Sequence, residues 1–319
     1  MRRRHQFELI QILRHFFQTK GFLEALTPPM VPNPGMETHI HPFRVAHGKN
    51  GALTDWYLHT SPEFCLKELL VDHQAEGLQN IYSLSYCFRD EPLSPIHRPQ
   101  FLMLEWYRLH ARYEKIMDDC QELLSLVQAS ASLPLRKNLK SQPLQRLTMA
   151  ELWQECVGRS PLDFLDASDL RQLIQADFPE VPLPSTALAW DDLFFLLHLN
   201  KVEPLLCRWP LLLVQEFPAP LAALSTLKPS DPRVCERFEI YVNGVELCNA
   251  YNELTDPREQ RRRFESQARE KQELYGYQLP PPTRFLAALE QGLPACSGIA
   301  LGVERLLHSL CEVENPFFY

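Results

Sequence analysis

Two glutamates, Glu239 and Glu246, flank an Asn-Gly pair and form the most chemically suggestive spacing in the chain. Asn243-Gly244 predicts a two-residue type I′ turn, because both central residues must adopt positive φ. With these residues at the tip, Tyr241 lies opposite Glu246 and Glu239 opposite Cys248, so the two glutamates point to one face. Two carboxylates held this close repel each other unless a cation or a proton lies between them. The pair could bind Mg²⁺ that arrives with the phosphates of a nucleotide; two solvated glutamates are the alternative.

A second group of reactive side chains lies on the predicted strand at 101–109. Alternation along a strand places Leu102, Leu104 and Trp106 on a core face. The opposite face carries an aromatic ring, a carboxylate and a phenol on what we expect to be an open sheet surface: Phe101, Met103, Glu105 and Tyr107. The preceding strand, 81–89, adds a polar side that ends at Arg89. This face is either a platform for a ligand or a solvated surface, and the pattern alone does not decide.

The elements that must position these residues follow from the spacing of apolar side chains. Helices are predicted at 4–19, 113–130, 148–156, 168–176, 189–199, 257–275 and 283–291, and residues 297–305 predict a strand that turns into a last helix. Ser61-Pro62-Glu63 predicts a helix start, with Ser61 as N-cap and Pro62 in the first turn. Strands are predicted at 22–26, 56–59, 81–89, 101–109 and 211–214 and in the hairpin. Long hairpins separated by helices predict an α+β fold, an antiparallel sheet flanked by helices.

Composition excludes several classes of protein. A chain of 319 residues with 45% hydrophobic residues is typical of a globular protein, and its net charge of −8 argues against general coating of nucleic acid. We find no signal peptide and no run of 18 apolar residues, so we expect a cytoplasmic protein without a membrane partner. The nine cysteines lack metal-type spacing and are expected to be free thiols in a reducing cytosol.

Four separated segments, in order, resemble the motifs of class II aminoacyl-tRNA synthetases. Motif 1 is similar to Gly21-Phe-Leu-Glu-Ala-Leu-Thr-Pro-Pro29, and motif 3 to Gly298-Ile-Ala-Leu-Gly-Val-Glu-Arg305. Motif 2 is similar to Phe88-Arg-Asp-Glu91, the loop with His97, and the strand 101–107. The hairpin glutamates with Asn249-Ala-Tyr-Asn-Glu-Leu254 resemble the metal and substrate segment of the lysyl type. The resemblance spans about residues 4 to 310 and implies one class II synthetase-like catalytic domain, 1–319, with a helical insertion at about 132–205.

Within that superfamily, motif 1 begins near residue 20, which leaves no room for the anticodon-binding domain of lysyl-tRNA synthetases, so tRNA is not expected as a partner. Segments such as Ser61-Pro-Glu63 and Glu246-Leu-Cys-Asn249 resemble the free-standing ligases that attach (R)-β-lysine to elongation factor P. Ala300 stands where lysyl-tRNA synthetases usually have Gly, which fits a β-amino acid. The resemblance implies a homodimeric, AMP-forming ligase. It would use ATP and Mg²⁺ to adenylate (R)-β-lysine, or a lysine-like amino acid, and transfer it to a lysine side chain of elongation factor P.

The resemblance also implies residue roles. Arg89, Arg305 and Glu246 would be catalytic, and Glu239 with Glu246 would bind the metal. ATP would be bound by Arg89, Asp90, Glu91, His97, Arg98, Phe101, Glu246, Leu247, Gly302 and Arg305. The amino acid would be bound by Ser61, Pro62, Glu63, Glu105, Tyr107, Asn249, Tyr251, Glu253 and Ala300.

Two other interpretations stay open at this point. The chain could be a truncated lysyl-tRNA synthetase-like enzyme that activates α-lysine, or an inactive paralogue that serves as a binding module. A relative of asparagine synthetase is disfavoured, because three acidic side chains suit a diamine better than an aspartate. The intact arginines and glutamates argue against the inactive paralogue.

The resemblance conflicts with strand alternation at one point. A regular strand would turn Glu246 to one face and Asn249, Tyr251 and Glu253 to the other, whereas the resemblance places all four in one site. We therefore predict a β-bulge near Leu247–Asn249, because a bulge inserts one extra residue and re-aims the side chains beyond it.

Overall fold

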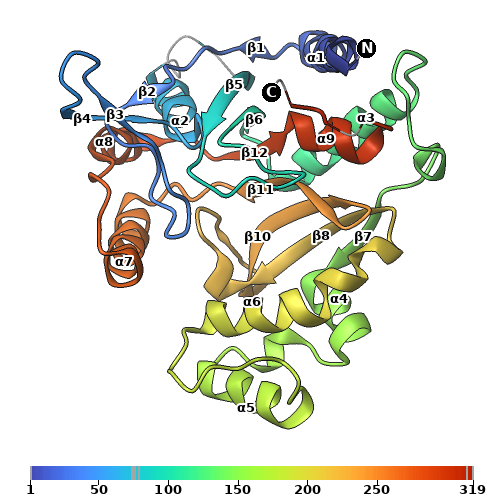
Figure 1. Ribbon diagram of the computed structural model, residues 1–319, viewed down its shortest axis with the longest axis vertical. Coiled ribbons are helices and arrows are strands. Elements are labelled where there is room, and N and C mark those ends of the chain that lie inside the picture. Colours follow the sequence, from blue (N-terminus) through green and yellow to red (C-terminus); the bar gives the residue numbers. More distant parts are fainter. Residues whose placement is uncertain (1, 73–76, 78–79, 314, 318–319) are drawn as a thin grey trace. The chain divides into compact units, whose positions relative to one another are not determined.

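The computed structural model describes residues 2–72, 77, 80–313 and 315–317. The chain forms two compact units, which are coloured along the sequence in Figure 1. Unit 1 comprises Met1–Pro134 and Glu253–Tyr319, and unit 2 comprises Leu135–Asn252. Among the described helices, none combines the length and the apolar content that crossing a lipid bilayer requires. The prediction of a single domain with a helical insertion at 132–205 stays a prediction.

Unit 1 contains four strands of a mixed sheet in the order β1-β5-β6-β12. The β1 strand pairs with β5 in parallel, and β5, β6 and β12 pair antiparallel. A separate three-stranded sheet has the order β2-β4-β3. The strands are β1 (Leu23–Glu24), β2 (Met30–Val31), β3 (Arg44–Ala46), β4 (Leu53–Leu58), β5 (Asn80–Phe88), β6 (Gln100–Leu109) and β12 (Cys296–Gly302).

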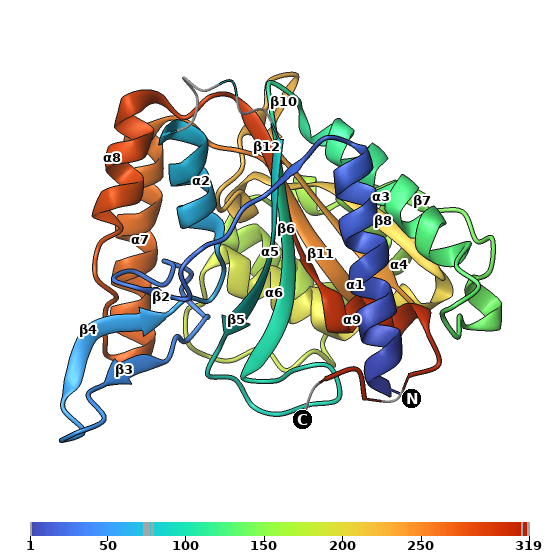
Figure 2. The same cartoon turned by 90° about the horizontal axis from the view of Figure 1, so that it is seen from above.

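The helices of unit 1 form two groups, which Figure 2 shows on opposite sides of β5 and β6. One group packs near β6 and β12: α1 (Arg2–Thr19), α3 (Tyr113–Gln128) and α9 (Val303–Leu310). The other group is α2 (Glu63–Asp72), α7 (Pro257–Tyr275) and α8 (Thr283–Gly292). The core beneath α1 is aromatic, because Phe17 stacks on Tyr82 with ring centroids 4.6 Å apart and lies 5.2 Å from Trp106. These rings cover the apolar face of β6, so its other face carries the polar side chains described below.

Unit 2 is a sheet with the strand order β11-β10-β8-β7, and β9 pairs with β10. Only β7 and β8 pair in parallel among these described strands. Helices pack against the sheet through an apolar core that includes Trp153, Phe194 and Val214. The elements are β7 (Gln145–Thr148), α4 (Met149–Val157), α5 (Ala167–Asp177), α6 (Trp190–Lys201), β8 (Leu211–Pro218), β9 (Leu227–Lys228), β10 (Asp231–Val242) and β11 (Val245–Asn252), with 3₁₀ turns at Lys137–Leu139, Pro161–Asp163, Glu203–Arg208 and Ala219–Leu221.

The predicted turn and the predicted bulge are both confirmed in the β10–β11 hairpin. Asn243 and Gly244 adopt φ of 48° and 83°, as a type I′ turn requires. Tyr241 pairs with Glu246, but the residue before it, Ile240, pairs with Cys248. Leu247 therefore has no partner in β10 and is the extra residue of the bulge. The expected pairing of Glu239 with Cys248 is wrong, because the bulge moves Asn249 opposite Glu239.

Most predicted elements are confirmed to within a few residues, and the α+β class is confirmed. The predicted strand at 22–26 is reduced to Leu23–Glu24, since Thr27-Pro28-Pro29 follows at once and proline cannot donate to a ladder. The helix α2 begins at Glu63, one residue later than expected, and the Ser61 hydroxyl accepts a hydrogen bond from the Glu63 N–H at 3.1 Å. The expected antiparallel arrangement has one parallel pair in each unit, β1 with β5 in unit 1 and β7 with β8 in unit 2.

Candidate active site

The polar face of β6 is buried, and the expected open surface is wrong. Glu105 and Tyr107 expose only 1% and 2% of their surface. The Glu105 carboxylate accepts hydrogen bonds from the Ser61 hydroxyl at 2.5 Å and the Tyr107 hydroxyl at 3.2 Å. The start of α2 therefore supplies the cover that strand alternation could not predict.

Ala300 lies opposite Glu105 in the β6–β12 ladder and shares its face. Gly298 pairs with Tyr107 in the same ladder. A Cβ on Gly298 would lie 2.3 Å from the Tyr107 ring and 2.5 Å from a carboxylate oxygen of Glu253. Only glycine fits here, so β12 lets the phenol and the Glu253 carboxylate lie directly against its backbone.

A buried lysine bridges two of the predicted amino-acid-binding glutamates. The Lys67 ammonium, on α2, donates to Glu63 at 2.5 Å and to Glu253 at 2.6 Å, and its side chain is 1% exposed. Burial alone would lower the pKa of Lys67, but Glu253 and Glu63 together raise it, so the lysine stays charged. It fixes the orientation of both carboxylates and supplies one positive charge between them.

The carboxyl groups around Lys67 are the groups that could bind a cationic substrate. Burial, and then the charge of Glu63, raise the pKa of Glu105 to about 8. Burial also raises the pKa of Glu253, against the opposing effect of Lys67. An incoming ammonium group would favour the ionised form of these carboxyls and pair with it, because its charge replaces the missing solvation. Glu63, Glu105 and Glu253 thus form an acidic cluster in unit 1 with the chemistry expected for a diamine.

The motif 2 and motif 3 arginines lie beside aromatic and imidazole groups. The Arg89 guanidinium lies over the Phe101 ring, 5.1 Å from its centroid, and its Nε donates to the Thr60 carbonyl at 3.3 Å. Arg305 donates to His97 Nε2 at 2.8 Å. Burial, and then Arg305, lower the pKa of His97, so its neutral imidazole can accept that hydrogen bond. Guanidinium groups held in this way suit phosphate and carboxylate recognition.

Three of the predicted ATP-binding residues have other neighbours here. Asp90 and Glu91 line a hollow in unit 1 together with His41, Tyr57 and Tyr277. Arg98 packs over the Phe317 ring at 4.6 Å and donates to the carbonyls of its own loop. Gly302, also predicted to bind ATP, ends β12 just before α9, where the nearby Glu304 carboxylate accepts from the Leu102 N–H at 2.9 and 3.0 Å.

In unit 2, the bulge gathers the predicted residues on one face of the β10–β11 hairpin. Direct pairing joins Tyr241 to Glu246, Glu239 to Asn249 and Arg237 to Tyr251. The buried Glu239 carboxylate accepts from Arg237 at 2.6 Å and from the Tyr241 hydroxyl. Arg237 also donates to Asn249 at 3.0 Å. Leu247, the bulge residue, is buried, so its predicted ATP contact could involve only its backbone.

Sequence reasoning missed Lys67 and Arg237, although both carried a signal. Lys67 follows Glu63 by four residues, the spacing at which side chains on a helix meet. Arg237 precedes Glu239 by two residues, which places it on the same strand face. Each residue holds a predicted glutamate in position, and neither contact could be distinguished from a solvated charge without the tertiary structure.

Comparisons with known proteins agree with this geometry. The family "tRNA synthetases class II (D, K and N)" matches residues 2–315. The chain is 37% identical to elongation factor P–(R)-β-lysine ligase of Erwinia tasmaniensis over 305 residues, covering 95% of this chain and 89% of the relative. It is 35% identical to the ligase of the same name from Vibrio vulnificus over 301 residues, which cover 94% of this chain and 88% of the relative. It is 37% identical to the ligase of Klebsiella pneumoniae strain 342 over 298 residues, which cover 92% of this chain and 86% of the relative. The chain therefore belongs to the class II tRNA synthetase family.

Proposed function

We propose that this protein is an ATP-dependent ligase that adenylates (R)-β-lysine, or a closely similar diamino acid, and transfers it to a lysine side chain of elongation factor P. The observation that carries the proposal is the acidic cluster of unit 1. Glu63 and Glu253 share the Lys67 ammonium, and the ammonium groups of a diamino acid would ionise the buried Glu105 carboxyl, whose pKa is about 8 in the free protein. Similarity to the named ligases supports the acceptor.

Activation joins two anions, the amino-acid carboxylate and the α-phosphate of ATP. The carboxylate oxygen attacks the α-phosphorus, and the bond to pyrophosphate breaks. Arg89 is proposed to hold the α-phosphate and the carboxylate, Arg305 the γ-phosphate, and Phe101 the adenine ring. No general base is needed, because positioning and neutralisation of charge carry the step. The Lys acceptor of elongation factor P would then displace AMP from the adenylate.

Magnesium is proposed to accompany ATP at Glu239 and Glu246. The donor set fits the ion, because both side chains supply hard oxygen ligands from one face of the hairpin. Arg237 and Tyr241 orient the Glu239 carboxylate. When bound, the ion would neutralise charge on the pyrophosphate leaving group.

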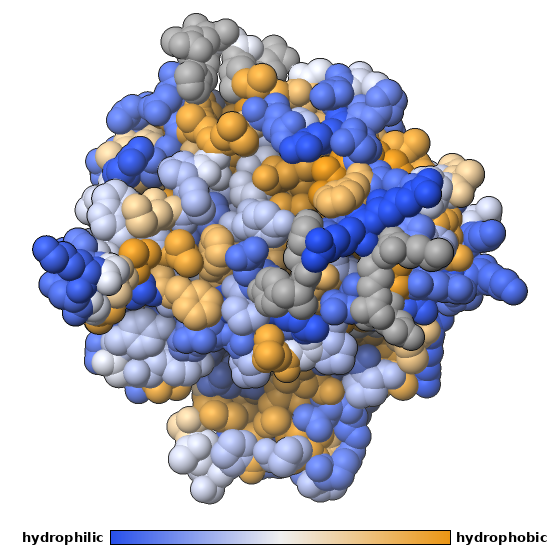
Figure 3. All heavy atoms as spheres, turned by 45° about the horizontal axis from the view of Figure 1, so that its top comes forward, coloured by the Kyte–Doolittle hydropathy of each residue, from blue (hydrophilic) through white to orange (hydrophobic). Residues whose placement is uncertain are grey.

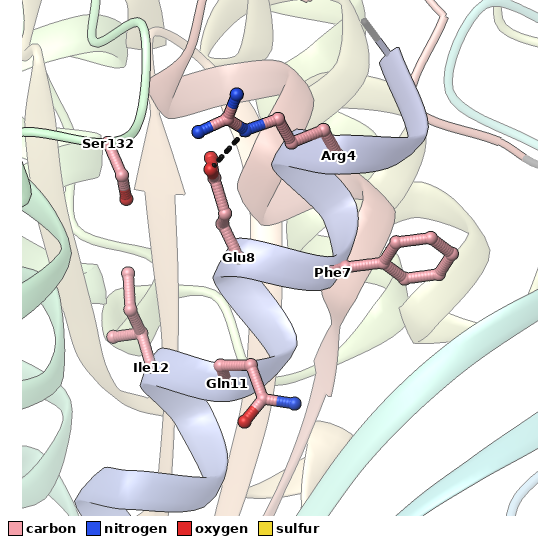
Figure 4. Close-up of a pocket in the computed structure, with 6 residues that line it drawn as sticks. All are labelled: Arg4, Phe7, Glu8, Gln11, Ile12 and Ser132. Carbon is pink, nitrogen blue, oxygen red and sulfur yellow. Dashed lines mark hydrogen bonds and ion pairs between the residues drawn. The ribbon is translucent and has the colours of Figure 1, made fainter.

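We further propose a homodimer that forms through motif 1. Large apolar side chains in and next to this segment are exposed: Leu23 by 52%, Leu26 by 85% and Met30 by 46%. Figure 4 shows Phe7 of α1 directed away from its neighbours Glu8 and Ile12, and it is 51% exposed. Figure 3 shows that one face of the molecule carries several apolar patches between hydrophilic side chains. Burial of such side chains against a second copy would stabilise a two-fold assembly.

Pyrophosphate exchange tests the function directly. We expect exchange with (R)-β-lysine to exceed exchange with (S)-β-lysine and with α-lysine, and expect the radiolabelled amino acid to appear on purified elongation factor P. Preference for α-lysine, with transfer to tRNA, would instead identify a truncated lysyl-tRNA synthetase-like enzyme. A folded protein without exchange on any of the three amino acids would support the inactive paralogue.

A further inference from the structure

A fourth carboxylate, outside every motif, lies across a small cavity from Glu63 of the acidic cluster. Glu37 lies in the loop between β2 and β3, and it lines a small cavity together with His59, Thr60, Ser61 and Glu63. The cavity measures about 10 Å³, close to the space that one water molecule or one ammonium group occupies. A small polar head group would therefore fit in it.

The loop backbone holds the Glu37 side chain toward this cavity. One of its carboxylate oxygens accepts from the Met36 N–H at 3.0 Å. A Cβ on Gly35 would lie 2.5 Å from that oxygen and 3.0 Å from the Thr60 hydroxyl, so glycine provides the space for the carboxylate. The buried Lys271 ammonium of α7 fixes the loop from outside, because it donates to the carbonyls of Glu37, Thr38 and Ile40 at 3.0, 2.8 and 2.7 Å.

His59, which also lines the cavity, is an independent sign of a missing hydrogen-bond donor. The side chain is 1% exposed, and its Nε2 lies 2.8 Å from the Tyr86 carbonyl, which can only accept. Nε2 therefore carries the proton, and Nδ1 is left as an acceptor. Burial lowers the pKa of His59, which keeps the ring neutral. Nδ1 has no hydrogen-bond partner in the described part of the chain, and a buried acceptor of this kind is costly unless a donor reaches it.

The cavity is linked through Thr60 to Arg89, where the reacting carboxyl group is expected. Thr60 lines the cavity, and its carbonyl accepts from Arg89, the residue proposed to hold the carboxylate and the α-phosphate. Glu105 and Tyr107 are not among the residues that line it. A diamino acid with its carboxyl at Arg89 would thus have its nearer amine at Glu37 and its distal amine at Glu105 and Tyr107.

We infer that Glu37 and His59 Nδ1, together with Glu63, bind the ammonium group nearest the reacting carboxyl, and that Glu37 determines the requirement for this second amine. The inference rests on the proposed function and extends it. An ammonium group has three N–H donors, which matches two carboxylates and one imidazole acceptor. A substrate without this amine would leave these acceptors unpaired, which is the condition for strong discrimination.

The test compares (R)-β-lysine with 6-aminohexanoate, which has the same carbon chain and distal amine but lacks the nearer amine. For the wild type, we expect kcat/KM in pyrophosphate exchange to favour (R)-β-lysine by on the order of a thousandfold. For Glu37→Gln, we expect kcat/KM for (R)-β-lysine to fall roughly 10- to 100-fold, from the loss of a charge-assisted hydrogen bond. The value for 6-aminohexanoate should stay the same or rise, and the KM for ATP should not change.

Two controls keep the outcomes distinct. Glu273→Gln replaces an exposed glutamate of α7 and should match the wild type in both substrates. Glu37→Asp retains the charge but shortens the side chain, and it should recover part of the preference if Glu37→Gln folds poorly. Equal loss of activity with both substrates in Glu37→Gln, or no loss in either, would overturn the inference. A wild type that exchanges no diamino acid would overturn the proposed function, and calorimetry of (R)-β-lysine binding to both proteins would then test Glu37 alone.

Discussion

Replacing Glu105 with glutamine should stabilise the free protein while abolishing its activity. Glu105 is buried, and burial followed by the charge of Glu63 raises its pKa from the ordinary value of 4.5 to about 8. Near pH 7.5, the folded chain therefore holds a proton on this carboxyl that the unfolded chain has released. Taking up that proton costs about 4 kcal/mol, from about 1.4 kcal/mol for each of three pH units.

The pH dependence has a defined sign. Because the folded pKa is raised above the unfolded value, the carboxyl's contribution to stability is fully present below about pH 4.5 and is lost as the pH rises toward 8. Glutamine has no such dependence, but it weakens the hydrogen bonds from Ser61 and Tyr107 by roughly 1–2 kcal/mol. The net gain for Glu105→Gln near pH 8 should be about 2 kcal/mol, which corresponds to a rise in Tm of roughly 3 °C for a chain of this length.

Differential scanning fluorimetry of the wild type, Glu105→Gln and the exposed control Glu273→Gln, between about pH 5.5 and pH 8.5, measures this effect. The Tm difference between Glu105→Gln and the wild type should grow across that range, and the control should show no trend. A constant offset, or a lower Tm for Glu105→Gln at pH 8, would refute the reasoning. If the stabilised variant also loses pyrophosphate exchange activity, the wild type keeps a destabilising carboxyl at this position because substrate binding requires it.

Four further outcomes can be measured. Glu246→Gln should lower kcat for exchange at least about 100-fold with an unchanged circular dichroism spectrum, and normal activity would contradict its role at the metal. Ala300→Gly should shift the kcat/KM ratio toward α-lysine by roughly tenfold, and an unchanged ratio would leave Ala300 without a role in specificity. Lys271→Met should leave three loop carbonyls unpaired, lower the Tm and raise the KM for the amino acid but not for ATP. Leu26→Asp should convert a dimer to a monomer in light scattering, whereas a monomeric wild type would contradict the dimer.

The sequence predicted the elements well because local rules govern them. Asn243-Gly244 specifies its own turn, and the alternation in β6 correctly separates Glu105 and Tyr107 from the core residues Leu104 and Trp106. Even the bulge at Leu247 could be predicted, because two independent requirements on the same strand disagreed. These features depend on residues that are close in the sequence.

What the sequence could not show depends on distant residues. Alternation assigns Glu105 to a face but does not state what covers that face, and the cover comes from Ser61, 44 residues away. Glu37 lies in a loop without periodicity, and Lys271, which anchors that loop, is 234 residues away. Tertiary packing turns such residues from ordinary surface charges into parts of a site.

The single extra residue at Leu247 reverses the alternation of side chains along β11. Side chains of β11 after Leu247 face the opposite way from those of an uninterrupted strand, so Asn249 and Tyr251 owe their orientation to a residue whose own side chain is buried elsewhere. Substitutions at Leu247 that keep its size preserve this orientation, whereas deletion of one residue there would exchange the two faces of everything that follows on the strand. The orientation of the later side chains thus depends on the number of residues in this segment rather than on which residues they are. Insertions or deletions in the segment should therefore be far less tolerated than replacements.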